Sequence, residues 1–198
     1  MKKGLIAIVV TVLLAAGLLG LSYTTSEKSS AGLIKCTERL LGDRCDVYLA
    51  PTMLPYQDND PVDFNHLIDL LNTAEKYDTI RIHLNGFGGA VFLEDQIDMA
   101  IKNSKAKVIT ILDGNVYSAH AFLFLSAKHH EYTRLDYTFM VHLGNVCEQP
   151  QEFGRLDVKN QNIRIFGAVV KLLTKDELKS FLSCQDVYLT GNPQITFE

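Results

Sequence analysis

Ser118 is the residue whose type and position most directly suggest nucleophilic chemistry. It follows the apolar stretch 108–112 and a turn expected at 113–115, and it precedes an apolar stretch expected to form a helix. A strand, a turn and a helix in this order present a hydroxyl at the edge of a sheet, where the helix dipole favours negative charge. An N-cap serine would occupy the same position, so the location alone leaves catalysis and capping both open.

His142 and a glycine pair could complete such a site. His142 directly follows the apolar segment 137–141, and a surface histidine just past a strand is the simpler interpretation of that position. Gly88 and Gly89 follow the expected strand 80–84, and their backbone N–H groups could hold a phosphate or an oxyanion. The glycine spacing fits neither of the common nucleotide-binding motifs, and a tight strand-to-helix turn is the alternative.

The elements that must position these residues alternate along the chain. Apolar periodicity predicts strands at 46–50, 80–84, 108–112, 137–141 and 187–189 and helices at 64–76, 90–103, 119–128, 153–173 and 175–182. Strands that alternate with helices form a mainly parallel sheet with right-handed βαβ crossovers, so we expect an α/β fold. The chemistry of such sheets sits at the carboxyl ends of the strands, where the glycine pair, Ser118 and His142 all fall.

The N-terminal segment predicts a connection to the membrane. Residues 4–21 carry no charge and follow two lysines, and a helix of this length rises about 27 Å, close to the thickness of a bilayer core. We expect residues 1–22 to be a signal peptide or an uncleaved membrane anchor, 23–34 a linker and 35–198 one compact domain. The lysines place the domain on the non-cytoplasmic side, either membrane-anchored or secreted.

Composition and cysteine count narrow the classes of function. The formal net charge is −4, so no basic field draws the chain to nucleic acid. The cysteines are Cys36, Cys45, Cys147 and Cys184, and none of them forms a C-x-x-C pair, so the sequence supports neither a zinc ribbon nor a thioredoxin motif. We expect no metal and no cofactor. An exported domain could pair them in two disulfides or keep them as free thiols, and the sequence alone does not choose a pairing. The local pairs Cys36–Cys45 and Cys147–Cys184 are our working hypothesis.

Four segments, taken together, resemble the Clp protease proteolytic subunit family over somewhat more than half of the chain. They read IRIHLNGFGGAVFLEDQIDMAI, VITILDGNVYSAHAFLFLSAK, YTFMVHLG and FLSCQDVYLTGN. The resemblance implies a ClpP/crotonase-like fold and places Ser118 on the nucleophile, His142 on the base and Asp186 on the acid of a catalytic triad. The order Ser, His, Asp along the chain differs from that of other serine hydrolase folds. In this arrangement a bridge between Cys147 and Cys184 would hold the acid near the base.

The resemblance also implies an activity and its partners. The chain would be a serine endopeptidase acting on peptides or unfolded proteins, with the N–H groups of Gly89 and Ala119 as the oxyanion hole. Gly88 and Phe87 would lie beside an extended substrate that adds to the sheet as a strand. The family further implies a homo-oligomeric ring. An unfolding ATPase needs cytoplasmic ATP, so we do not expect one beside an exported domain.

Departures from the family pattern keep other functions open. Phe87 stands in place of the loop proline, Tyr117 in place of the alanine before the nucleophile, and His120 in place of the glycine two residues after it. His120 is expected to face away from Ser118. A crowded turn of this kind would suit a catalytically inactive scaffold or binding subunit. A signal peptide peptidase-like membrane protease is a third alternative, but it needs a Ser–Lys dyad, and Lys128 lies at the far end of its expected helix.

Overall fold

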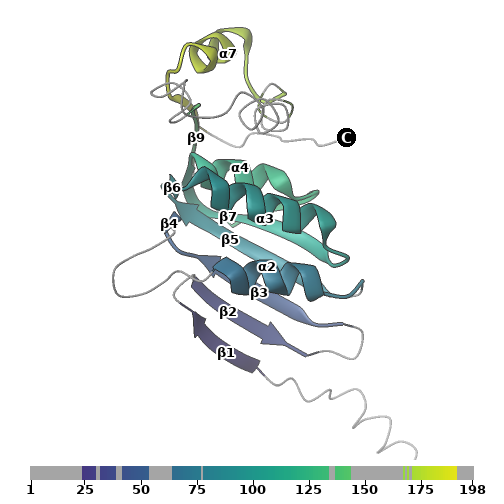
Figure 1. The fold of residues 1–198 in the computed structure, drawn as a ribbon. Coiled ribbons are helices and arrows are strands. Elements are labelled where there is room, and N and C mark those ends of the chain that lie inside the picture. The colour runs from purple at the N-terminus through teal and green to yellow at the C-terminus, as the bar shows by residue number, and fades with distance from the viewer. Residues whose placement is uncertain are drawn as a thin grey trace, which may run out of the picture.

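The computed structural model shows a sheet with helices packed against it (Figure 1). The residues that it describes are 24–29, 32–38, 42–53, 64–76, 78–133, 137–143, 167, 169 and 171–190. The expected membrane segment 1–22, Cys147 and residues 153–166 of an expected helix lie outside these ranges, so those expectations stay predictions. Within the described ranges, no helix combines the length and the apolar character that crossing a bilayer requires.

The described strands are mostly joined in one sheet. They are β1 (Thr24–Ser29), β2 (Gly32–Thr37), β3 (Arg44–Leu49), β4 (Thr52–Met53), β5 (Thr79–Gly86), β6 (Gly88–Gly89), β7 (Lys107–Tyr117), β8 (His129–Tyr132), β9 (Thr138–Val141) and β10 (Val187–Thr190). The main sheet has the order β1-β2-β3-β5-β7-β9-β10, with β8 also paired to β7, while β4 and β6 pair separately. Strands β3, β5, β7 and β9 run parallel to one another, and β1, β2 and β10 pair antiparallel. The mainly parallel α/β sheet expected from the sequence is confirmed.

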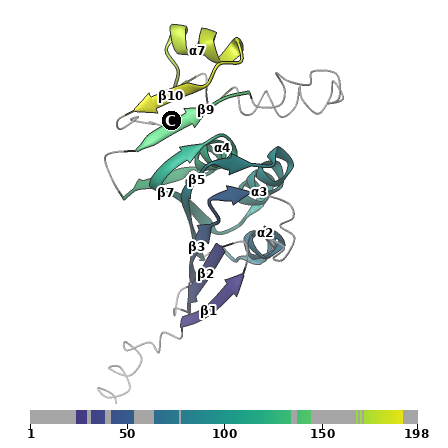
Figure 2. The same ribbon diagram turned by 90° about the vertical axis from the view of Figure 1, so that its left-hand side faces the viewer.

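Helices cover one face of this sheet (Figure 2). The described helices are α2 (Phe64–Thr73), α3 (Val91–Asn103), α4 (Ala119–Ser126) and, further along the chain, α7 (Lys175–Leu182). Helix α2 lies between β3 and β5 in the chain, α3 between β5 and β7, and α4 between β7 and β9, as βαβ crossovers require. Helix α2 buries Phe64, Leu67 and Leu71, whose spacing puts them on one side of the helix. The core between helices and sheet holds the parallel strands in the register that the site below depends on.

The opposite face of the sheet carries an ionic network. Arg81 contacts Asp46 at 3.1 Å and Glu131 at 2.7 Å. His83 lies between two carboxylates, 3.2 Å from Asp46 and 2.6 Å from Asp113. Because successive side chains of a strand point to opposite faces, these polar residues alternate with core residues of the same strands. His83 is therefore engaged on the far face from the helices.

Two stretches differ from what the sequence led us to expect. Residues 24–29 and 32–34 fall in the expected linker, but they form β1 and the start of β2, because pairing with each other and with β3 satisfies their backbone groups. Residues 113–115 were expected to be a turn, and that expectation is wrong, since they lie inside β7. Strand β7 pairs with neighbours on both sides, and its register with β5 shifts near Asn85. The Asp-Gly-Asn sequence therefore forms an irregular stretch within the strand.

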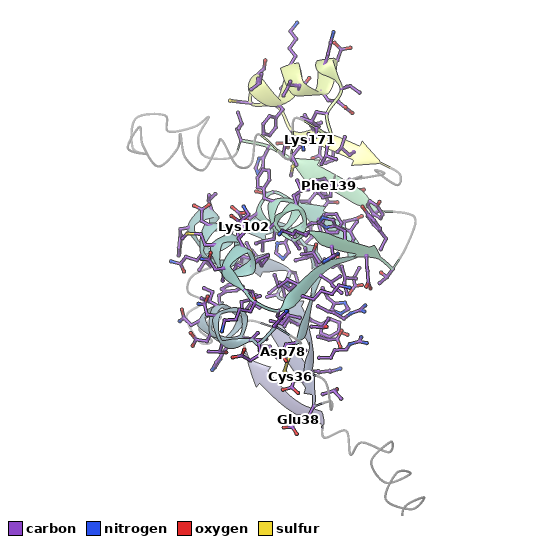
Figure 3. The ribbon with its side chains drawn as sticks, turned by 90° about the vertical axis from the view of Figure 1, so that its right-hand side faces the viewer. Cys36, Glu38, Asp78, Lys102, Phe139 and Lys171 are labelled. Atoms are coloured by element: carbon purple, nitrogen blue, oxygen red, sulfur yellow. A yellow bond between two sulfur atoms is a disulfide. The ribbon has the colours of Figure 1, made fainter. Side chains whose placement is uncertain are left out.

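A disulfide joins two neighbouring strands near one end of the sheet. It joins Cys36 on β2, labelled in Figure 3, to Cys45, which lies directly opposite on β3. The predicted pairing of Cys36 with Cys45 is therefore confirmed. Cys184 is disulfide-bonded as well. Its expected partner, Cys147, lies outside the described residues, so the second pairing stays a prediction.

Candidate active site

Ser118 occupies a sharp turn between β7 and α4. Its backbone has φ 55° and ψ −125°, a conformation that residues with a side chain rarely adopt. The turn is held by a hydrogen bond from the Ser118 N–H to the carbonyl of Met140 at 2.9 Å and by the buried neighbours Val116 and Ala119. The side chain makes no capping hydrogen bond to α4, so the simple N-cap interpretation fails. Strained turns of this kind present a nucleophile at the end of a strand.

His142 meets Ser118 because β9 lies beside β7 in parallel. The pairing sets Tyr117 opposite Met140, so the residues that follow the two strands emerge at the same edge of the sheet. The Nε2 atom of His142 lies 2.7 Å from Oγ of Ser118. In a neutral imidazole that accepts the hydroxyl proton at Nε2, the ring proton sits on Nδ1.

Asp186 stands at the other side of the His142 ring. Strand β10 runs antiparallel to β9 with Val187 opposite Val141, and this register brings the residue before Val187 next to the residue after Val141. The Oδ1 atom of Asp186 lies 3.4 Å from Nδ1 of His142. The Asp186 side chain is 49% exposed, so water reaches the acid end of the site.

Helix α7 leads the chain back to Asp186. It has the bounds predicted from the sequence and begins with a capping box. In this box the Thr174 hydroxyl accepts from the Glu177 N–H, and the Glu177 carboxylate accepts from the Thr174 N–H. Phe181 is fully buried and anchors the helix, and Cys184, with φ 63°, turns the chain into β10. Helix α7 on one side and strand β10 on the other thus set the position of Asp186.

The glycine pair is packed directly against the Ser118 turn. Gly88 has φ 94°, and a Cβ there would lie 2.7 Å from Cβ of Ser118. Gly89 has φ 146°, and a Cβ there would collide with the carbonyl of Met53 on β4. Only glycine lets the backbone approach so closely. The loop that contains Gly89 and the first turn of α4, which contains Ala119, therefore meet beside the serine.

His120 also belongs to this site, although its position in the sequence did not indicate this. Its side chain is fully buried, and Nδ1 accepts a hydrogen bond from the Gly88 N–H at 3.0 Å. Nε2 lies 3.0 Å from the carbonyl of Ala50. Burial lowers the pKa of His120 to about 4, so the ring is neutral at neutral pH. A histidine in an otherwise apolar helical stretch, where the family has glycine, was the signal available in the sequence.

Phe87 and Tyr117 form an aromatic pair beside the turn. Their rings stack with 5.8 Å between centroids and 11° between planes. Phe87 is 68% exposed although it is flanked by buried glycines. Phe87 adjoins Gly88 and Tyr117 adjoins Ser118, so the pair offers an apolar surface next to the hydroxyl.

A serine, a histidine and a carboxylate at neighbouring strand ends of a parallel α/β sheet form the arrangement that serine hydrolases use. Among the described residues, no group of three or more potential ligands is placed to hold a metal ion.

The Clp protease family model matches residues 41–170, well over half of the chain. The chain therefore belongs to the Clp protease family. No curated protein matches it in a sequence comparison. The matched range contains Ser118 and His142 and ends before Asp186.

Proposed function

We propose that the chain is a serine endopeptidase that hydrolyses peptide bonds through Ser118, His142 and Asp186. The observation that carries the proposal is the 2.7 Å contact between Ser118 Oγ and His142 Nε2 at the ends of two adjacent parallel strands. Membership of the Clp protease family supports peptide hydrolysis as the reaction class.

The proposed reaction proceeds through an acyl-enzyme. Ser118 Oγ attacks the peptide carbonyl while its proton passes to Nε2 of His142, and Asp186 stabilises the imidazolium that results. The imidazolium then donates this proton to the amine nitrogen as the C–N bond breaks. A water molecule attacks the acyl group, its proton passes to His142 and then to the departing Oγ, and the free serine is restored. The histidine thus serves as base and acid in turn.

The oxyanion hole is proposed to consist of the N–H groups of Gly89 and Ala119. Both belong to segments that meet at Ser118, and the second lies in the first turn of α4, where the helix dipole favours a negative oxygen. Loss of one such donor typically slows catalysis by about 10²–10³-fold. Substrate would lie extended along the glycine loop, with Gly88 allowing close approach and Phe87 contacting a side chain.

We further propose that the domain works outside the cytoplasm. The disulfide between Cys36 and Cys45 supports this, because disulfides persist in oxidising compartments. Residues 1–22 would be the signal peptide or anchor, which makes the membrane a partner of the chain. Peptides or unfolded proteins are the proposed substrates, in a homo-oligomeric ring that works without an ATPase.

A signal peptide peptidase-like mechanism needs a lysine as the base, and the position of Lys128 argues against that role for it. Lys128 lines a cavity together with Lys107, the first residue of β7. Ser118 follows the last residue of this 11-residue strand, so the two ends lie roughly 30 Å apart. Lys128 is therefore far from the hydroxyl that it would have to activate.

The test is labelling by a fluorophosphonate probe, which reacts only with an activated serine. The full chain would be purified in mild detergent under oxidising conditions, beside Ser118→Ala and His142→Ala. Ser126→Ala is the matched control, because Ser126 lies on the same helix and its hydroxyl donates to the carbonyl of Phe122. We expect labelling of the wild type and the control and none of the two site variants. A folded wild type that is not labelled would contradict the peptidase and favour an inactive Clp-fold scaffold.

A further inference from the structure

The two N–H groups of the proposed oxyanion hole belong to different elements. Gly89 lies in β6, and Ala119 lies in the first turn of α4. Neither element alone determines the distance between the two donors. A catalytic constellation must be held to within about 0.5 Å, so whatever joins the two elements bears directly on the reaction rate.

His120 joins them. It is the second residue of α4, one position after Ala119, and its Nδ1 accepts the hydrogen bond of the Gly88 N–H at 3.0 Å. Its Nε2 lies 3.0 Å from the carbonyl of Ala50, in the segment that leads into β4. One imidazole thus connects α4, the glycine loop and the backbone on which that loop rests.

The chemistry of these two contacts leaves a single form of the ring. The amide of Gly88 can only donate, and the carbonyl of Ala50 can only accept. Nδ1 must therefore be unprotonated and Nε2 must carry the proton, in a neutral ring. The full burial of His120 favours the same neutral form. A Cβ at Gly86 would lie 2.8 Å from Nε2, so the strand end is shaped around the imidazole.

The loop is anchored on both sides of Gly89. The Phe87 N–H donates to the carbonyl of Pro51 at 2.7 Å, and the Ala90 N–H donates to the carbonyl of Met53 at 2.7 Å. Between these two contacts, the bond from Gly88 to His120 is the one that reaches α4. The other two contacts tie the loop to the chain around β4 and do not reach α4.

We propose that His120 is a positioning residue that sets the spacing between the two oxyanion donors by accepting the N–H of Gly88. The inference rests on the proposed function. The role requires a side chain that accepts a hydrogen bond two residues after the nucleophile, and His120 supplies this acceptor.

Two variants distinguish the two hydrogen bonds that the imidazole makes. In His120→Asn the side-chain oxygen can take the place of Nδ1 and accept from Gly88, but nothing reaches Ala50. In His120→Gln the amide nitrogen can take the place of Nε2 and donate to Ala50, while the acceptor for Gly88 is lost. Each variant leaves one hydrogen bond unmade at a buried site, so the two should lose thermal stability to a similar extent.

The readout is hydrolysis of p-nitrophenyl acetate by the full chain, with kcat and KM measured separately and the melting temperature beside them. We expect His120→Gln to lower kcat by about 10–100-fold with KM changed by less than about 3-fold, because misplaced donors cost transition-state stabilisation. His120→Asn should keep kcat within about 5-fold of the wild type. Thr110→Val is the control, since Thr110 is fully buried under α4 and its hydroxyl donates to the carbonyl of Phe124 at 2.8 Å. It should lower the melting temperature and leave kcat unchanged.

The outcomes distinguish this inference from the function on which it rests. Equal kcat in the Asn and Gln variants, or losses of kcat that simply follow the melting temperature, would overturn the role of His120 while the wild type still hydrolyses the ester. A wild type that reacts with neither the ester nor the fluorophosphonate would overturn the proposed function itself, and the role of His120 with it.

Discussion

Asp186 and His142 meet across the antiparallel pair formed by β9 and β10, with 3.4 Å between Oδ1 and Nδ1. The contact depends on one register, in which Val187 faces Val141. A slip of that register would turn the following side chains to the opposite face of the sheet and remove the carboxylate from the ring. The orientation of the His142 ring in the candidate site is therefore set by the pairing of β9 with β10.

Replacing the carboxylate tests this orientation. Asp186→Asn should lower kcat for ester or peptide hydrolysis by about 10²–10³-fold with little change in KM, because the imidazolium loses its stabilising charge. The measurement is steady-state kinetics at pH 7.5. Asp176→Asn on the exposed first turn of α7 is the matched control and should change kcat by less than about 2-fold. Full activity in Asp186→Asn would mean that another group orients His142.

A substitution at Gly88 tests whether the close approach of the glycine loop to Ser118 matters for reactivity. In Gly88→Ala the new Cβ would lie 2.7 Å from Cβ of Ser118, and the backbone would keep a φ of 94° that alanine disfavours. We expect fluorophosphonate labelling to slow by at least about 100-fold. The control is Gly167→Ala, because a Cβ at Gly167 would meet none of the described residues within 4 Å. Labelling of Gly88→Ala at the same rate as the control would show that the glycine loop does not contact the site at which Ser118 reacts.

A substitution at Phe87 tests which substrate side chains the candidate site prefers. The ring is 68% exposed and stacks on Tyr117, the residue before Ser118, so it should bind an apolar side chain near the scissile bond. Phe87→Ala should raise KM for a fluorogenic peptide with an apolar residue at that place by about 5–10-fold, which corresponds to roughly 1 kcal/mol of lost contact. Hydrolysis of p-nitrophenyl acetate, which has no such side chain, should not change.

The matched control for Phe87 is Phe92→Ala on α3, since Phe92 is also an exposed phenylalanine, at 49%. It should leave KM for the peptide as it is in the wild type. An equal effect of the two variants would indicate general loss of surface area and would remove Phe87 from the substrate site.

The buried histidines predict how stability depends on pH. Burial lowers the pKa of His120 and of His130 to about 4, whereas both have a pKa near 6.5 in an unfolded chain. Between these values the unfolded state binds more protons, so the free energy of unfolding falls as the pH is lowered from 6.5 towards 4. The fully buried His120 contributes up to about 3 kcal/mol to this fall, and the partly exposed His130 contributes less because water screens its charge.

Urea unfolding at pH 7, 6, 5 and 4.5 measures that slope. His120→Asn does not titrate in this range, so its free energy of unfolding should fall less steeply than that of the wild type, although it starts lower. Parallel curves for the two proteins would contradict a neutral, buried His120.

Most elements of the fold could be predicted from local sequence pattern. The alternation in 80–84 and the apolar run in 108–112 indicate strands, and both lie within the observed β5 and β7. Helix α7 has its predicted bounds, since its capping box and its apolar spacing lie within one short stretch of chain. The pattern failed where distant partners decide the conformation. The expected turn at 113–115 lies inside β7, whose pairing with β5 runs to Leu112 and resumes at Val116.

For the candidate site, the sequence by itself determined that Ser118 and His142 follow strands of a parallel sheet. That conclusion needs only the order of the elements and the rule that parallel strands end at one edge. The tertiary structure decided the rest: the 2.7 Å contact of His142, the arrival of Asp186 beside its ring, and the contact of His120 with Gly88. Hydrogen bonds of this kind depend on strand register and on the close approach of glycine backbone, and neither is written in the periodicity of a single segment.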